Sequence, residues 1–179
     1  MNSTGCPLDW IERTKDITDE GKSSVRSANP DEREAMARAL NILACDSLAA
    51  DTSIRRLPQG RYRLGGVMRA SVTQTCVVTL DPVPEKIEEA FEVEFWPPEM
   101  LEARAPAGEK GVLDGPDVEP LVKNAVDVGR IVFELLSASL EPYPRKAGAE
   151  FEWSGPEADA PETKPDSPFS VLEKLRPKE

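Results

Sequence analysis

The sequence predicts an α+β fold: a small, twisted antiparallel sheet of four to five strands with two packed helices and a short tethered C-terminal helix. Three stretches of the chain alternate apolar and polar residues with a period of two, which is typical of strands with one buried face. Two further stretches repeat apolar residues at helical spacing, and each starts at a capping residue. We therefore expect one mixed domain built on a meander of strands.

The longest alternating stretch lies within Arg61–Val83 and is expected to form the central strand. Gly65 and Gly66 predict a bulge or turn that leads into this strand, and Asp81-Pro82 predicts the turn that ends it. The face expected to be buried, which only Gln74 interrupts, consists of Met68, Ala70, Val72, Cys76, Val78 and Leu80.

Two neighbouring stretches are expected to pair with the central strand. Asp46–Leu57 alternates and joins it through Pro58-Gln59-Gly60, which predicts a hairpin. Lys86–Phe95 alternates after Pro82–Pro84 and is expected to pair with it on the other side through a short turn. The apolar face of this last strand contains Ile87, Glu89, Phe91, Val93 and Phe95. Its other face, expected to be solvated, contains Glu88, Ala90, Glu92 and Glu94.

Capping residues mark the two helices. Asn29 precedes Pro30, whose missing N–H costs nothing in a first turn, so a helix is expected from about residue 30 to 43. Asp127 caps a second helix that is expected to run to about Leu140, where Pro142-Tyr143-Pro144 ends it. The stretch Glu99–Glu119 is rich in Pro, Gly and acidic residues and predicts a long loop.

Composition divides the chain into four segments. Residues 1–28 are expected to be mostly weakly ordered, with an edge strand or a docking segment as an option. Residues 29–145 form the α+β core domain, and 146–166 form a flexible, acidic, Pro-rich linker. Residues 167–179 are expected to form a short docking helix with Phe169, Leu172 and Leu175 on one side. Trp10 is either an anchor onto the domain or a hook for a partner.

Charge and residue usage exclude several classes of function. The net charge of −11 argues against a protein that coats nucleic acid, and no DNA partner is expected. The chain has no histidine, so it lacks the commonest metal ligand and the commonest general base near neutral pH. Cys6, Cys45 and Cys76 are scattered, as is typical of reduced thiols in a cytosol, and no stretch is apolar enough for a membrane span. We expect a cytoplasmic protein without a membrane partner.

The arginines provide the first candidate binding site. Five arginines and no acid lie between Thr52 and Leu80, whereas fifteen acids and five bases lie between Asp81 and Glu141. A guanidinium group suits phosphate and carboxylate equally well. Three interpretations stay open: ion pairs with the glutamates of the neighbouring strand, contact with RNA, or contact with a protein. The candidate residues, expected side by side on the hairpin, are Arg55, Arg61, Arg63 and Arg69.

Cys76 and the acidic loop are the candidates for catalysis or metal binding. A catalytic thiol needs a neighbouring base or an electropositive pocket, so a buried structural cysteine is the simpler interpretation of Cys76. Asp114, Asp117 and Glu119 could hold a hard cation, but they match no calcium-loop pattern. No catalytic residue, metal or cofactor is expected.

Several stretches together resemble one protein family. They are GRYRLGGVMRASVTQTCVVTLDPVPEKIEEAFEVEF, then VDVGRIVFELLSASLEPYPRKAGAEF, and the terminal SPFSVLEKL, in this order. They resemble the YceD family, the large ribosomal RNA subunit accumulation proteins, and Asn29–Leu57 resembles the version in alphaproteobacterial members. Many members have a CxRC pair at the central strand; here its first position is Thr73 and only Cys76 remains. The motif residues expected to be structural are Cys76, Asp127, Pro142, Pro144, Phe169 and Leu172.

The resemblance implies a cytoplasmic, non-enzymatic factor for the accumulation of large-subunit ribosomal RNA and for ribosome assembly. Its expected partner is the pre-ribosomal large subunit, reached through ribosomal RNA or through a basic ribosomal protein. RNA would suit the arginine hairpin. A basic protein would suit an acidic face made of Glu88, Glu92, Glu94, Asp114, Asp117 and Glu119. The alternative from another class is a small-molecule enzyme or carrier that uses Cys76 or the clustered carboxylates.

Overall fold

Three long antiparallel strands form the frame of the molecule. The computed structural model describes residues 6–103 and 117–150. Strand β3 (Ala44–Arg56) pairs with β4 (Tyr62–Thr75), and β4 pairs with β5 (Pro82–Trp96). The hairpin between β3 and β4 turns at Pro58–Gly60, where the expected turn lies. The sequence-predicted meander is confirmed.

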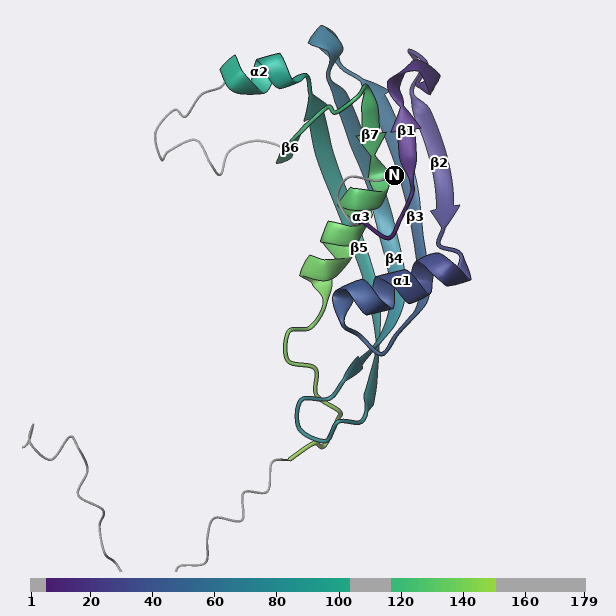
Figure 1. Ribbon diagram of the computed structural model, residues 1–179, viewed down its shortest axis with the longest axis vertical. Helices are drawn as coiled ribbons and strands as arrows, with labels where there is room; N and C mark the ends of the chain where they lie inside the picture. Colours follow the sequence, from purple (N-terminus) through teal and green to yellow (C-terminus); the bar gives the residue numbers. More distant parts are fainter. Residues whose placement is uncertain (1–5, 104–116, 151–179) are drawn as a thin grey trace, which may run out of the picture. The chain divides into compact units, whose positions relative to one another are not determined.

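Two shorter strands complete a five-stranded sheet in the order β2-β3-β4-β5-β6 (Figure 1). Strand β2 (Lys22–Ser27) is antiparallel to β3 and forms one edge. Strand β6 (Asp117–Pro120) lies at the other edge and pairs in parallel with Val93–Trp96 of β5. The sheet therefore has the expected strand number, but it is not purely antiparallel.

The N-terminal segment adds a second layer, whereas the sequence predicted weak order over most of it. Strand β1 (Ile11–Arg13) pairs with β7 (Ala125–Asp127) as a separate two-stranded sheet, and a short helical turn follows at Thr14–Asp16. Trp10 is buried, and its indole N–H donates to Glu32 at 3.1 Å. The anchor interpretation of Trp10 is the one that the structure shows. Sequence analysis did not predict this layer for two reasons. Apolar residues are sparse in the N-terminal segment, and β1 pairs with a strand that lies far away in the sequence.

Helix α1 (Pro30–Leu40) starts where its cap predicts. The Asn29 side chain accepts from the Glu32 backbone N–H, and the Glu32 carboxylate accepts from the Asn29 backbone N–H, each at 2.9 Å. This reciprocal pair is a capping box. The helix ends at Asn41, which is left-handed with φ 54°, so it stops before the expected residue 43.

Helix α3 (Val128–Ser139) also has its predicted start and packs on the sheet. Asp127 accepts from the backbone N–H of Arg130 at 3.0 Å. Beyond the helix, the Gln74 side chain of β4 donates to the carbonyl of Glu141 at 3.0 Å, which explains the polar residue on the buried face. Pro142 and Pro144 follow as expected, and Pro144 is buried.

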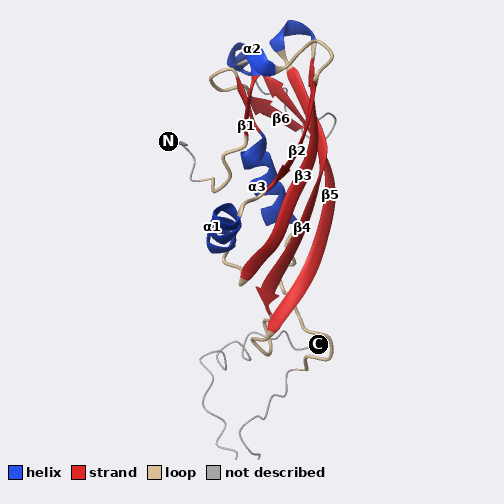
Figure 2. Cartoon of the chain, turned by 90° about the vertical axis from the view of Figure 1, so that its right-hand side faces the viewer, coloured by secondary structure: helices blue, strands red, loops and turns tan. Residues whose placement is uncertain are grey.

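Both α1 and α3, together with β1 and β7, lie on one face of the five-stranded sheet (Figure 2). The core fills the space between them. Fully buried side chains come from both layers: Leu8, Met36, Ile54, Leu64, Met68, Val72, Cys76, Phe95, Val126, Val128, Val132 and Leu136. We call the opposite side, on which no described helix lies, the outer face.

Two expectations about β4 are wrong. The strand ends at Thr75, and a turn follows, so Leu80, which was expected on the buried face, is exposed although the alternation continues to it. Gly65 and Gly66 form no bulge, since they pair in regular register with Ser53 and Thr52. A Cβ at Gly66 would lie 2.3 Å from the Asp51 carbonyl, so this glycine allows close approach of the two strands. The irregularity is instead in β3, between Cys45 and Ser47.

The stretch expected to be a loop contains helix α2 (Pro98–Ala103) and β6. The described residues up to Ala149 belong to one compact unit. Asp114, most of the expected linker and the expected helix 167–179, with Phe169 and Leu172, lie outside the described residues. None of the described helices is long and apolar enough to cross a membrane.

Candidate binding surface

The candidate arginines lie on the outer face together with Glu88, Glu92 and Glu94. Arg63 stands directly opposite Glu94 in the register of β4 and β5, and Arg69 stands opposite Glu88. On the other neighbouring strand, Arg55 stands opposite Arg63. The two charged halves of the sequence are therefore interleaved strand by strand and do not form two separate surfaces.

Glu94 is the centre of a buried ion-pair cluster at one end of this face. Its side chain is 5% exposed, and Arg63 approaches it with Nη2 at 2.7 Å and Nε at 3.2 Å. Arg61 lies 3.6 Å away, and the Trp96 indole N–H donates to the same carboxylate at 2.8 Å. The guanidinium of Arg61 also lies 5.2 Å from the Trp96 ring centre.

Two opposing effects set the pKa of Glu94. Burial raises it, but hydrogen bonds from Arg63 and Trp96, and the charges of both arginines, lower it below its ordinary value overall. The same hydrogen bond, aided by the charge of Glu92, raises the pKa of Arg63. Glu94 is thus a buried, ionised carboxylate held by neighbouring side chains, whereas the sequence predicted a solvated residue.

Arg69 is paired as well, at a more exposed place. It contacts Asp51 of β3 at 2.6 Å and Glu88 of β5 at 3.3 Å, with all three side chains about half exposed. The hydrogen bond to Asp51, then that to Glu88, raises the pKa of Arg69. The cross-strand ion pairs expected as one interpretation of the arginines are present at Arg61, Arg63 and Arg69.

Arg55 differs from the other candidate arginines. It is exposed, and within the described residues no carboxylate lies at ion-pair distance from it. Its neighbour Arg56 points to the other side of the strand and lies 3.7 Å from Asp19. A free guanidinium is thus available at the hairpin end of β3.

Several of the acidic candidates are also paired with basic side chains of the protein itself. Glu119 of β6 forms an ion pair with Arg130 of α3, and Glu92 lies 3.7 Å from Arg63. Asp117 is exposed at the start of β6. The expected acidic face is therefore not one continuous anionic patch.

Small side chains occupy the centre of the outer face. They leave a shallow hollow of about 600 Å³ over β2, β3 and β4. Asp51, which lines it, is held by Arg69. The lining residues are Ser23, Ser24, Val25, Asp51, Thr52, Ser53, Gly65, Gly66 and Val67.

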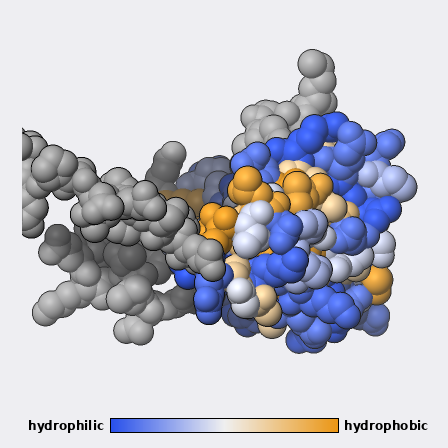
Figure 3. Space-filling view, turned by 90° about the horizontal axis from the view of Figure 1, so that it is seen from below, coloured by the Kyte–Doolittle hydropathy of each residue, from blue (hydrophilic) through white to orange (hydrophobic). Residues whose placement is uncertain are grey.

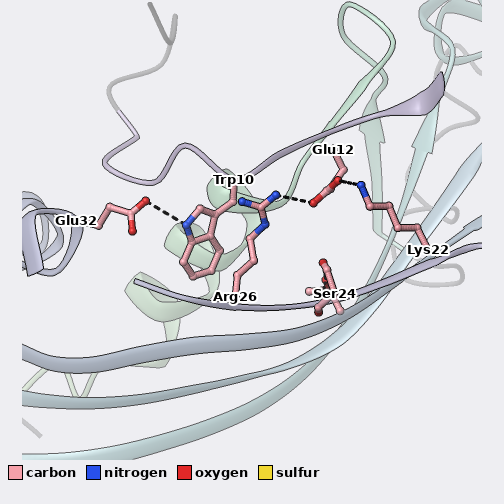
Figure 4. A network of polar contacts seen from close by, with 7 residues as sticks. Trp10, Glu12, Lys22, Ser24, Arg26 and Glu32 are labelled. Carbon is pink, nitrogen blue, oxygen red and sulfur yellow. Dashed lines mark hydrogen bonds and ion pairs between the residues drawn. The ribbon is translucent and has the colours of Figure 1, made fainter. Parts of the chain in front are cut away.

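A second buried carboxylate, Glu12, lies on the opposite side of the sheet. It is 3% exposed, on β1, and it accepts from Lys22 at 2.5 Å and from Arg26 at 2.7 Å, both on β2 (Figure 4). Burial raises its pKa, but the two hydrogen bonds and the two charges bring the pKa below its ordinary value. Sequence reasoning missed this residue because nothing in the sequence links β1 to β2 at this point.

Cys76 lies in the turn after β4 and is enclosed, with 0% of its surface exposed. Its sulfur accepts from the backbone N–H groups of Thr79 and Lys146, each at 3.4 Å. Hydrogen bonds, above all from the Thr79 side chain, lower its pKa to about 6. The turn is also tied by Val77 N–H to the Pro144 carbonyl at 2.9 Å, and by Lys146 to Asp81 at 2.9 Å.

These contacts join the turn to the chain after α3. No candidate base contacts the thiol in the described part of the chain, and the same residues contain no group of three His, Cys, Asp or Glu side chains that could hold a metal. Figure 3 views this end of the molecule, where apolar side chains show between polar ones. The exposed apolar residues near this end are Leu43, Val77, Leu80 and Tyr143.

The family model of the large ribosomal RNA subunit accumulation protein YceD matches residues 64–176, more than half of the chain. The chain belongs to the YceD family. The YceD match begins at Leu64 in β4 and includes β5 with Glu94 and Trp96, the Cys76 turn and α3, whereas Arg61 and Arg63, which hold Glu94, precede it. It leaves out β1, β2, α1 and β3, and with them Glu12 and Arg55. No curated protein and no solved structure matches the chain.

Membership in the YceD family links the chain to the accumulation of large-subunit ribosomal RNA. The resemblance recognised from the motifs is thereby confirmed. Of the motif residues, Asp127 caps α3, while Cys76 and Pro144 join the β4–β5 turn to the chain after α3. The binding roles of the charged candidates remain predictions.

Proposed function

We propose that this protein supports large-subunit ribosomal RNA accumulation without catalysis, by binding a basic ribosomal protein of the pre-ribosomal large subunit. The observation that carries the proposal is the family match. A role on that assembly would place the protein in the cytoplasm. The geometry bears on the kind of partner, because a binding surface needs charges that are not already paired within the protein itself.

The ion pairs of the outer face favour a protein over RNA. Arg63 and Arg69 each hold two carboxylates within 4 Å, so a phosphate would have to displace an existing anion. The chain as a whole has eleven more negative than positive charges, which repels a polyanion and attracts a polycation. Aromatic side chains for stacking on bases are scarce, since aromatic residues make up 6% of the chain.

The absence of catalysis is proposed from the surroundings of Cys76. The thiol faces N–H groups and a threonine hydroxyl, and it is closed off from solvent. A substrate could reach it only if the turn after β4 opened. The enzyme alternative makes the opposite prediction: a Cys76→Ser protein would fold normally but fail to support ribosomal RNA accumulation.

Sedimentation tests the proposal. Tagged protein from a native lysate is expected to co-migrate with large-subunit precursors in a low-salt gradient. After capture and nuclease digestion, a basic ribosomal protein should stay bound. Loss of the partner on digestion would indicate RNA contact. Migration only as a free protein, with unchanged large-subunit RNA in a deletion strain, would overturn the proposal.

One double charge-reversal variant separates RNA from protein contact. Arg55→Glu with Arg56→Glu reverses the exposed end of the β3 hairpin and leaves the Glu94 cluster intact. If RNA were the partner, this variant would lose co-migration because its freest guanidinium groups are gone. A protein partner predicts that it co-migrates as wild type does.

A further inference from the structure

Within residues 6–103 and 117–150, one edge of the five-stranded sheet is unpaired along most of its length. Strand β5 runs from Pro82 to Trp96, and β4 pairs with it over that whole length. On its other side, β6 pairs only with Val93–Trp96. Among the described residues, no strand pairs with β5 on that side between Pro82 and Glu92.

An open edge offers backbone hydrogen-bonding groups to another chain. In an antiparallel pair, alternate residues direct their N–H and C=O groups away from the partner strand. The stretch Glu85–Glu92 therefore presents donors and acceptors in the plane of the sheet. The contact with β6 shows that this edge accepts an added strand, because its last four residues already have one.

The side chains on this edge select the charge of an added strand. Glu88 and Glu92 project to the outer face, and Glu85 and Glu89 to the other face, with Lys86 as the only base among them. Glu88 contacts Arg69, and Glu92 contacts Arg63. Glu85 and Glu89 form no ion pair with a described residue. Both faces of the edge are thus acidic.

This charge pattern also excludes a second copy of the chain. Edge-to-edge pairing of two such strands would bring glutamates together, and like charges across a strand pair are destabilising. Pro82 and Pro84 lack an N–H group and limit pairing at the start of β5. The open stretch thus matches about eight residues of an extended basic chain, close to the usual length of a strand.

We propose that the β5 edge from Glu85 to Glu92 binds an extended lysine- or arginine-rich segment of a ribosomal protein as an added strand. This inference rests on the proposed function and identifies the contact through which the partner is held. Backbone pairing supplies the affinity. The glutamates on both faces select basic side chains, whichever way the guest alternates.

A defined peptide tests the edge directly. The probe is a fluorescein-labelled peptide of about ten residues in which lysine and valine alternate, so that it can form one strand. The same lysine–valine peptide methylated at every backbone nitrogen has the same charge but no N–H group to donate to the edge in either register. In about 0.1 M salt, we expect roughly tenfold weaker binding of the methylated peptide by fluorescence anisotropy.

Charge reversal at the edge provides the matched variant pair. Glu85→Lys with Glu89→Lys changes one half-buried and one exposed residue that no described ion pair uses, and roughly tenfold weaker peptide binding is expected. Asp16→Lys with Glu20→Lys makes the same change in net charge near the opposite edge, and less than about twofold loss is expected. Thermal unfolding followed by circular dichroism checks that both variants fold.

Hydrogen exchange locates the contact. The lysine–valine peptide should slow amide exchange within Glu85–Glu92 and leave β2 unchanged. Equal binding of the two peptides, equal loss in both variants, or protection only elsewhere would overturn the inference. Dimerisation of the free protein through β5, seen as protection that grows with concentration, would overturn it as well.

The two proposals fail in different ways. If the edge variant loses the peptide but still co-migrates with large-subunit precursors, the edge is not the ribosomal contact, and the proposed function stands. If wild-type protein binds the peptide but never co-migrates, the proposed function fails. If wild type co-migrates and the edge variant does not, both are supported.

Discussion

Glu12 and Glu94 are both buried, and each is held by two basic side chains, yet they connect different parts of the fold. Glu94 pairs within one sheet, with residues of the adjacent strand and an indole on its own strand. Glu12 pairs between two sheets, because β1 belongs to the small sheet and β2 to the large one. Glu94 therefore links neighbouring strands within the large sheet, whereas Glu12 links the small β1–β7 sheet to the large one.

Two buried carboxylates with the same number of basic partners can therefore contribute differently to the stability of the fold. A carboxylate with a third donor, as at Glu94, keeps a partner when one arginine is lost. Glu12 depends on Lys22 and Arg26 alone among the ion pairs described. Four measurements test this comparison.

The largest effect is expected when Glu12 loses both cations. Lys22→Met with Arg26→Met leaves a buried carboxylate without a counter-charge, which should lower the free energy of unfolding by about 3 kcal/mol. Urea denaturation at neutral pH measures this loss. Adding Glu12→Leu should recover most of it, because the uncompensated charge is removed. A loss that the third substitution does not relieve would contradict this account.

A smaller loss is expected from Glu94→Ala. The indole N–H of Trp96 loses its acceptor, while the two arginines are 42% and 24% exposed and can be hydrated instead. We expect a loss of about 2 kcal/mol. Glu92→Ala is the control on the same strand and the same face, and its exposed pair should be worth less than about 0.5 kcal/mol. Equal losses would show that Glu94 contributes no more than a surface residue.

The pH dependence distinguishes both carboxylates from surface acids. The folded-state pKa of each lies below its ordinary value of 4.5, so the stability that each contributes is present above that value and is lost as the pH falls through the folded pKa. Wild type should therefore exceed Glu12→Gln and Glu94→Gln in stability at pH 7, and the differences should shrink as the solution is acidified below about pH 4.5. Denaturation at several pH values measures this. A difference that grows on acidification would have the wrong sign.

The smallest effect is expected at Arg69. Its partners Asp51 and Glu88 are 49% and 64% exposed, so water can replace each contact. Arg69→Met should leave the urea midpoint nearly unchanged, and any difference should disappear in high salt. A large, salt-independent loss would indicate that the pair is more protected than its exposure suggests.

Local signals predicted the frame of this fold correctly. The Asn29-Pro30 cap and the Asp127 cap mark real helix starts, and alternation located β3, β4 and β5. These signals succeed because capping and pleating depend on nearby residues. The end of β4 was missed because alternation continues through Val78 and Leu80 while the backbone already turns at Cys76.

The candidate surface was predictable only in part. Counting charges suggested opposite fields in the two halves, but antiparallel pairing places Arg63 against Glu94 and cancels them. The cancellation follows only from the register of β4 and β5, that is, from which residues stand opposite each other. The short turn between the two strands already limited that register. Trp96, two residues after Glu94 and on the same face, was the available sign that this glutamate is buried. Nothing comparable in the sequence pointed to Glu12.

The pairing of β1 with β7 has a consequence for the order of folding. The β3–β4–β5 meander closes through short turns, and hairpins of this kind form in about 1–10 μs. Ile11, in contrast, meets Asp127 across almost the whole domain, and such closure is slow because the chain entropy between the two strands must be lost first. During synthesis, β1 leaves the ribosome more than a hundred residues before β7, yet it can pair only after β7 has emerged. This strand is therefore expected to wait unpaired while the β3–β4–β5 meander forms.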